Sequence, residues 1–196
     1  MVNMKSKLAI ITIALGTCLT TTLSFANTAK RPETYKPATI GCVIEAAQSY
    51  KIPPALMLAV ASVEGGKNGT ASRNKNTTYD IGHFQLNTMH WKKGGFFSDT
   101  DMGEARWNGC YNAKLASRLM RYQLDLHGKK DFWTAAAAYH SVTPRHNARY
   151  RRLLQKKTYE WQAWLNQVGK VCAARSNKAS PCKVAYVPPK RQVVRR

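Results

Sequence analysis

Glu64 is the carboxylate in this sequence whose surroundings best suit acid catalysis. The chain has only ten Asp and Glu residues among 196, and most stand where a solvated charge is expected. Leu56, Val60 and Glu64 are spaced by four, so on a helix the carboxylate continues an apolar stripe. Burial and the negative end of the helix dipole both raise the pKa of such a carboxyl group. We therefore expect a protonated Glu64 that acts as a general acid near neutral pH.

Two glycines, Gly65 and Gly66, follow this carboxylate and end the helix. Because they have no side chains, they predict that a ligand can approach Glu64 closely. Position alone is equally compatible with a solvent-exposed Glu at a frayed helix end, so other residues must decide.

Other reactive side chains do not form a recognisable site. The five histidines show no metal-ligand spacing, so the sequence predicts neither a metal nor a cofactor. His140-Ser141 lacks the nucleophile elbow of a serine hydrolase. Gly65, Gly66 and Gly69 lack the Gly-Lys-[Ser/Thr] ending of a phosphate-binding loop.

The elements that would position Glu64 are mostly helical. Apolar spacing and breaker residues predict helices over residues 39–50, 54–64, 110–126, 132–139 and 147–168. The second of these is apolar nearly all round and should be buried. Residues 67–80 read as an irregular loop or a small hairpin. The fold class is therefore mainly α, with a small β element near 70–86.

The N-terminus has the pattern of a secretory signal peptide. Lys5 and Lys7 precede an apolar run that ends at Ser24-Phe25-Ala26, which places small residues at positions −3 and −1 of a cleavage site. The sequence thus predicts a signal peptide over residues 1–26 and no stable membrane span after cleavage. An uncleaved anchor and a lipoprotein at Cys18 are weaker readings, because the run is short and contains several threonines.

Four cysteines remain after the signal peptide: Cys42, Cys110, Cys172 and Cys182. An even number in an exported chain indicates two disulfides, for which three pairings exist. We favour Cys42–Cys110 with Cys172–Cys182, because the latter pair closes a short loop.

The net charge of +21 predicts a polyanionic partner. Charge alone does not choose between cell-wall polymer with its carboxylate-bearing stem peptides, an anionic membrane and nucleic acid. Export favours the wall, so nucleic acid is not the expected partner. Seven Lys or Arg residues and no acids follow position 174, and this tail is predicted to be disordered.

Two downstream segments accompany Glu64 in a specific order. They are Gly82-His83-Phe84-Gln85-Leu86-Asn87 and the stretch Ala138-Tyr139-His140-Ser141. With them, residues 42–150 resemble the soluble lytic transglycosylase family. The set Glu-Gly-Gly, Tyr-Asp-Ile-Gly and Tyr-His-Ser-x-Thr-Pro is most similar to small members that serve type IV secretion, conjugation and pilus machines. Some of these carry a disulfide where Cys42 and Cys110 stand.

The resemblance implies a lysozyme-like α+β domain and cleavage of the bond between N-acetylmuramic acid and N-acetylglucosamine in peptidoglycan. Glu64 would be the single catalytic acid, and the product would be 1,6-anhydromuramic acid. Tyr139 would help position Glu64, whereas Gln85, Asn87 and His140 would contact the sugar. No second carboxylate is required, because the substrate's acetamido group stabilises the sugar cation.

The expected organisation is a signal peptide at 1–26, a leader at 27–38, the transglycosylase domain at 39–172 and a basic tail at 173–196. The expected location is the periplasm, against the cell wall, in possible association with a secretion or conjugation machine. The chain departs from the family at Gly65, Phe84 and His140, where Ser, Met and Asn are usual. The departures at Gly65 and His140 motivate one alternative, an inactive peptidoglycan-binding or scaffold module. A conventional hydrolysing lysozyme is a second alternative.

Overall fold

The helix α2, Pro54–Glu64, lies at the centre of the fold. The computed structural model describes residues 35–128 and 131–174. Eight of the eleven α2 residues are buried, as the apolar composition of this segment predicts. Pro54 occupies the first helical position, and Gly65 ends the helix in the left-handed conformation with a φ of 59°. The carboxylate of Glu64 is thereby fixed at the last turn of the most buried helix.

Helix α1, Ile40–Ser49, precedes α2 and packs against it and against α4. The Thr39 hydroxyl accepts a hydrogen bond from the backbone N–H of Cys42 and caps the helix. Val43, Ala46 and Ala47 form its buried face. This helix was predicted within one residue at each end.

A three-stranded antiparallel sheet follows α2. Its strands are β1, Ala71–Arg73, β2, Tyr79–Ile81, and β3, Leu86–Asn87, in the order β1-β2-β3. The register places Asp80 opposite Asn87 and Ile81 opposite Leu86. The predicted small β element is confirmed, and its pairing brings two polar side chains together. The 3₁₀ helix η1, Thr88–Trp91, continues directly from β3.

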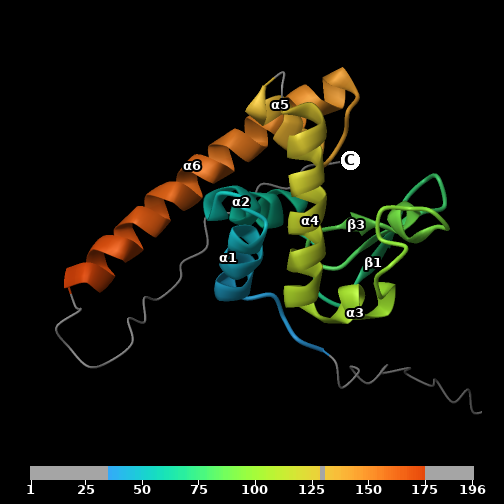
Figure 1. Cartoon of the computed structure of the whole chain (residues 1–196), viewed down its shortest axis with the longest axis horizontal. Helices are drawn as coiled ribbons and strands as arrows, with labels where there is room; N and C mark the ends of the chain where they lie inside the picture. The colour runs from blue at the N-terminus through green and yellow to red at the C-terminus, as the bar shows by residue number, and fades with distance from the viewer. Residues whose placement is uncertain (1–34, 129–130, 175–196) are drawn as a thin grey trace, which may run out of the picture. The chain divides into compact units, whose positions relative to one another are not determined.

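Helix α4, Gly109–His127, separates the sheet from the C-terminal helices (Figure 1). It is preceded by the short helix α3, Met102–Trp107, which the sequence did not predict. The Asp101 carboxylate caps α3 by accepting from the backbone N–H of Glu104, which lies within the helix. Figure 1 shows the strands on one side of α4, whereas α6 starts near the top of α4 and crosses it, so that most of α6 lies on the other side.

The last helices are α5, Phe132–Ala137, and α6, Pro144–Ala174. Asp131 caps α5 as predicted, because its carboxylate accepts from the backbone N–H of Thr134 at 2.8 Å. Helix α6 begins three residues earlier than predicted and packs along α2 and α5. The indole Nε1–H of Trp161 donates to Ser62 Oγ at 2.8 Å, which ties α6 to the helix that carries Glu64.

A disulfide joins Cys42 to Cys110, as predicted, and links α1 to the first turn of α4. The second predicted disulfide lies outside the described residues, because Cys182 and the side chain of Cys172 are not described. The predicted signal peptide and leader up to residue 34, and the tail from residue 175, also lie outside them. Within 35–128 and 131–174, no helix has both the length and the apolar character needed to cross a membrane.

Candidate active site

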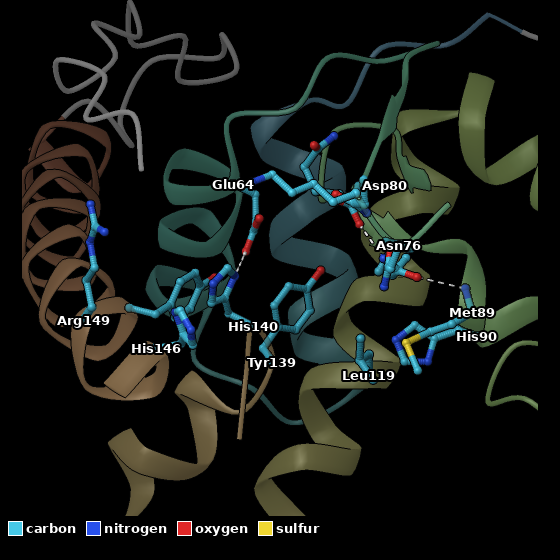
Figure 2. Close-up of a pocket in the computed structure, with 16 residues that line it drawn as sticks. Glu64, Asn76, Asp80, Met89, His90, Leu119, Tyr139, His140, His146 and Arg149 are labelled. Atoms are coloured by element: carbon cyan, nitrogen blue, oxygen red, sulfur yellow. Dashed lines mark hydrogen bonds and ion pairs between the residues drawn. The ribbon is translucent and has the colours of Figure 1, made fainter. Parts of the chain in front are cut away.

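A cleft of about 700 Å³ brings all five predicted site residues together. Glu64, Gln85, Asn87, Tyr139 and His140 line it, although the chain separates them by up to 76 positions. Helix α2 supplies the acid, the sheet supplies the two amides, and the segment after α5 supplies the two rings. Figure 2 shows Glu64 directed toward His140, with Tyr139 beside them.

The Glu64 side chain is 5% exposed and so is almost withdrawn from water, as its place on an apolar stripe predicts. Its Oε1 atom lies 3.8 Å from Nδ1 of His140. Burial, and to a lesser degree the charge of His146, lower the pKa of His140, so the imidazole is neutral near pH 7. A neutral imidazole does not stabilise an ionised carboxylate as a cation would. The His140 ring therefore places no fixed positive charge beside the Glu64 carboxyl group at neutral pH.

Two tyrosines flank the Glu64 carboxyl group, Tyr139 partly buried and Tyr150 buried. Burial first, and then the charge of Glu64, raise the pKa of Tyr139 well above its ordinary value. The Tyr139 hydroxyl donates its proton to the carbonyl oxygen of Phe84 at 2.9 Å. Both phenols therefore stay protonated, since burial and the same charge also raise the pKa of Tyr150.

Tyr150 was not among the predicted site residues, yet it lies beside Glu64. Its ring stacks on His140 with 4.7 Å between centroids and 1° between planes. Its hydroxyl is buried and makes no hydrogen bond of standard geometry with the described residues. The hydroxyl is close enough to Glu64 that hydrogen bonding to this carboxylate contributes to its raised pKa. The predicted helix over residues 147–168 includes Tyr150, but the sequence of that helix does not indicate a contact with Glu64.

The segment Gly82–Asn87 is held against the acid by a buried amide. Asn112 of α4 accepts from the backbone N–H of Phe84 at 2.8 Å and donates to the carbonyls of Ile81 and Ala105. Since Tyr139 binds the Phe84 carbonyl, both backbone groups of Phe84 are fixed. Gln85 is thereby held with a φ of 53°, a conformation uncommon for a residue other than glycine.

Gln85 and Asn87 differ in the groups they can offer a sugar. Gln85 donates to the Gly82 carbonyl at 2.9 Å, and its side-chain oxygen remains available to the cleft. Asn87 donates to Thr78 Oγ1 and to Asp80 Oδ1, at 3.0 and 2.9 Å, and accepts from the Met89 N–H. Both amide hydrogens of Asn87 are therefore used within the protein, and only its carbonyl oxygen can contact a ligand.

Asp80 is a second carboxylate in the same cleft. It is 3% exposed, and the sequence did not single it out as a site residue. Asp80 belongs to the Tyr-Asp-Ile-Gly motif, which could have marked it as a site residue. Only the pairing of Asp80 with Asn87 in the sheet shows that its carboxylate is directed into the fold. The sequence alone offered no convincing second acid near Glu64, and the structure places one along the cleft.

Gly66 does not provide access for a ligand, contrary to the prediction. A Cβ atom on Gly66 would lie 2.3 Å from the carbonyl oxygen of Gly82 and 2.7 Å from that of His83. The absent side chain instead allows the chain after α2 to pass against the backbone of the next segment. Among the described residues, no three or more His, Cys, Asp or Glu side chains are grouped as metal ligands would be.

The comparison with known proteins agrees with this geometry. The model of the transglycosylase SLT domain matches residues 41–162, which contain the whole cleft. The chain belongs to the transglycosylase SLT domain family. Its mainly helical fold with a small sheet is that of a lysozyme-like SLT domain. A protein of Escherichia coli O157:H7 named "Peptidoglycan-binding-like protein" is 28% identical over 173 residues, which cover 83% of this chain and 93% of the relative.

Proposed function

We propose that this SLT-domain protein is a peptidoglycan lytic transglycosylase with Glu64 as its catalytic acid. The observation that carries the proposal is the nearly buried Glu64 carboxyl at the end of α2, open to the cleft and bordered by a neutral histidine and two protonated tyrosines. A carboxyl group in such surroundings can deliver a proton at neutral pH.

The reaction starts with proton transfer from Glu64 to the glycosidic oxygen between muramic acid and glucosamine. The bond from this oxygen to the anomeric carbon breaks, and the substrate's acetamido oxygen stabilises the resulting cation. The Glu64 carboxylate then accepts the proton of the muramic 6-hydroxyl, whose oxygen bonds to the anomeric carbon. Glu64 is regenerated, no water is consumed, and the muramic product is the 1,6-anhydro sugar.

The other residues of the cleft have supporting roles in this proposal. Tyr139 and Tyr150 hold the acid in position, and the side-chain oxygen of Gln85 accepts from a sugar hydroxyl or amide. Asn87 fixes Asp80 and offers its carbonyl oxygen, while the exposed edge of the His140 ring contacts the sugar. The ring of His140 is locked by its stack on Tyr150, so it presents a defined edge.

We also propose that the protein is exported by the N-terminal signal and acts in the periplasm, where a disulfide such as Cys42–Cys110 forms and persists. The domain extends over 39–172, between the leader and the basic tail. Local openings in the wall for a secretion, conjugation or pilus machine would be the biological use. The type IV-like motif set named above supports this use.

Mass analysis of the products from purified sacculi tests the proposed reaction. The protein, its Glu64→Gln variant and a control variant, Glu45→Gln, are compared; Glu45 is exposed on α1 and does not line the cleft. We expect anhydromuropeptides from the protein and from Glu45→Gln, and none from Glu64→Gln.

Two other outcomes would reject this reaction in favour of specific alternatives. Reducing-end products would indicate a hydrolase, in which the cleft carboxylate of Asp80 holds the attacking water. Binding to sacculi without any product would indicate a peptidoglycan-binding module, an activity that the name of the Escherichia coli relative suggests.

A further inference from the structure

Arg149 lies at the mouth of the cleft, one residue before the tyrosine that faces the acid. It belongs to α6 and lines the cleft together with His146, one turn earlier on the same helix. Figure 2 shows both residues on α6, on one side of Glu64, while Asn76, Met89 and His90 lie on the other side. A sugar bound at Glu64 would therefore share the cleft with this arginine.

The guanidinium group of Arg149 has no hydrogen-bond or ion-pair partner among the described residues. The residue is exposed. Arg118, Arg121 and Arg151 behave differently, because each pairs with a carboxylate. Arg149 therefore offers all of its N–H donors to a ligand.

The acidic and basic side chains that line the cleft differ in their exposure to solvent. The two carboxylates, Glu64 and Asp80, are buried, whereas the cations at the rim, Lys75 and Arg149, are exposed. The rim therefore presents positive charge to whatever part of the substrate projects out of the cleft. A glycan backbone of N-acetylated sugars without muramic acid carries no charge that would match this rim.

Peptidoglycan supplies the matching charge through its stem peptides. Each stem is attached to a muramic residue beside the scissile bond and carries carboxylates. We propose that Arg149 binds a stem-peptide carboxylate of the muramic residue being cleaved, so that peptide-bearing strands are preferred over strands without stems; the proposal rests on the proposed transglycosylase function. A planar guanidinium group matches a carboxylate in a bidentate arrangement.

The net charge of +21 offers a competing explanation, in which every exposed cation attracts the anionic polymer equally. The two explanations differ in the distance over which the charges act. At physiological ionic strength charges more than about 8 Å apart are largely screened, so a specific contact must depend on Arg149 itself. Arg152, which is exposed on the same helix but does not line the cleft, is the matched control.

The experiment measures binding without turnover. Full-length protein carrying Glu64→Gln is titrated with fluorescently labelled glycan strands, either peptide-bearing or stripped of stems by an amidase. The readout is the Kd for stripped strands divided by the Kd for peptide-bearing strands. This ratio is measured for the Glu64→Gln protein and for the same protein that also carries Arg149→Gln, Arg149→Lys or Arg152→Gln. Because Arg149 and Arg152 are exposed, we expect their substitution to leave the fold intact, and equal Tm values for the variants would verify this.

We expect Arg149→Gln to reduce the preference for peptide-bearing strands by about three- to tenfold, the range for an exposed charge-assisted contact. Arg149→Lys should retain part of the preference, because it keeps the charge but not the bidentate geometry. Arg152→Gln should leave the ratio within about twofold of the background, since a single exposed charge outside the cleft contributes little.

An equal loss in Arg149→Gln and Arg152→Gln would overturn the proposal in favour of the general positive field, and so would an unchanged ratio in Arg149→Gln. Failure of the proposed function is seen separately, as the absence of anhydromuropeptides from the protein with Glu64 intact. Because the Kd ratio does not depend on cleavage, the two failures cannot be confused.

Discussion

The disulfide Cys42–Cys110 closes a loop that contains the acid, the sheet and α3, and its removal should cost much of the stability of the domain. The two cysteines are 68 positions apart. For a loop of this length the chain-entropy relation gives about 15 cal/mol/K, which is about 4 kcal/mol at 25 °C. For a domain of this size that loss lowers Tm by roughly 8–16 °C.

The perturbation is the double substitution Cys42→Ser and Cys110→Ser, and the assay is urea unfolding followed by tryptophan fluorescence. We expect the free energy of unfolding to fall by about 4 kcal/mol and m to rise, because the unfolded chain is less compact without the cross-link. Dithiothreitol should reproduce the loss in the unmodified protein. A further effect of dithiothreitol on the double variant would indicate the second predicted disulfide, Cys172–Cys182.

A decrease below about 1 kcal/mol with unchanged m would refute this reasoning, since it would mean that the unfolded chain is already restrained without the bond. Cleavage of sacculi provides a second readout. Because the loop carries Glu64 and the whole sheet, we expect activity to be lost at the same urea concentration as the fluorescence signal in both proteins.

Three further variants test the surroundings of the acid. Burial lowers the pKa of His140, so acidification below this lowered pKa charges the ring, which then favours the ionised form of Glu64 over the protonated acid. His140→Gln should therefore shift the acidic limb of the kcat/KM profile to lower pH, and superimposable profiles would contradict this. Gly66→Ala places a Cβ against the Gly82 carbonyl and should lower the free energy of unfolding by about 1–3 kcal/mol in denaturant titrations. Tyr150→Phe removes a hydroxyl that makes no standard hydrogen bond, so Tm should hardly change while kcat falls about tenfold; unchanged kcat would exclude a positioning role.

Local signals in the sequence were sufficient for most helices. Pro54 and Gly65 bound α2, and Asp131 caps α5, because these residue types act within one turn of where they stand. The same local reasoning misplaced the start of α6. Pro144 was read as a break, although proline is compatible with a first helical position, and the helix begins there. The short helix α3 was missed because six residues are too few to show a helical periodicity.

The candidate site was predictable only as a set of residues. Glu64, Gln85, Asn87, Tyr139 and His140 were named from motifs, and they line one cleft. Their partners were not predictable, because these depend on contacts between distant segments.

Asp80 is the clearest example of a site residue whose contacts could not be predicted from the sequence. Its burial follows from a register with Asn87, and that register depends on the sheet being held by Asn112 from α4, 32 positions further along the chain. Tyr150 likewise meets Glu64 only because α6 docks on α2. Neither contact has a signature within a short window of sequence.

The two walls of the cleft are encoded in separate parts of the chain. Glu64 and the sheet precede residue 88, whereas Tyr139, His140, Arg149 and Tyr150 all follow residue 138. During synthesis the proton donor is therefore made well before the rings that surround it. An unfinished chain, or one clipped before α6, carries a reactive carboxyl group without the surface that holds a sugar against it. Under the proposed function, the protein thus becomes able to cleave the wall of its own cell only when nearly all of it has been made and folded.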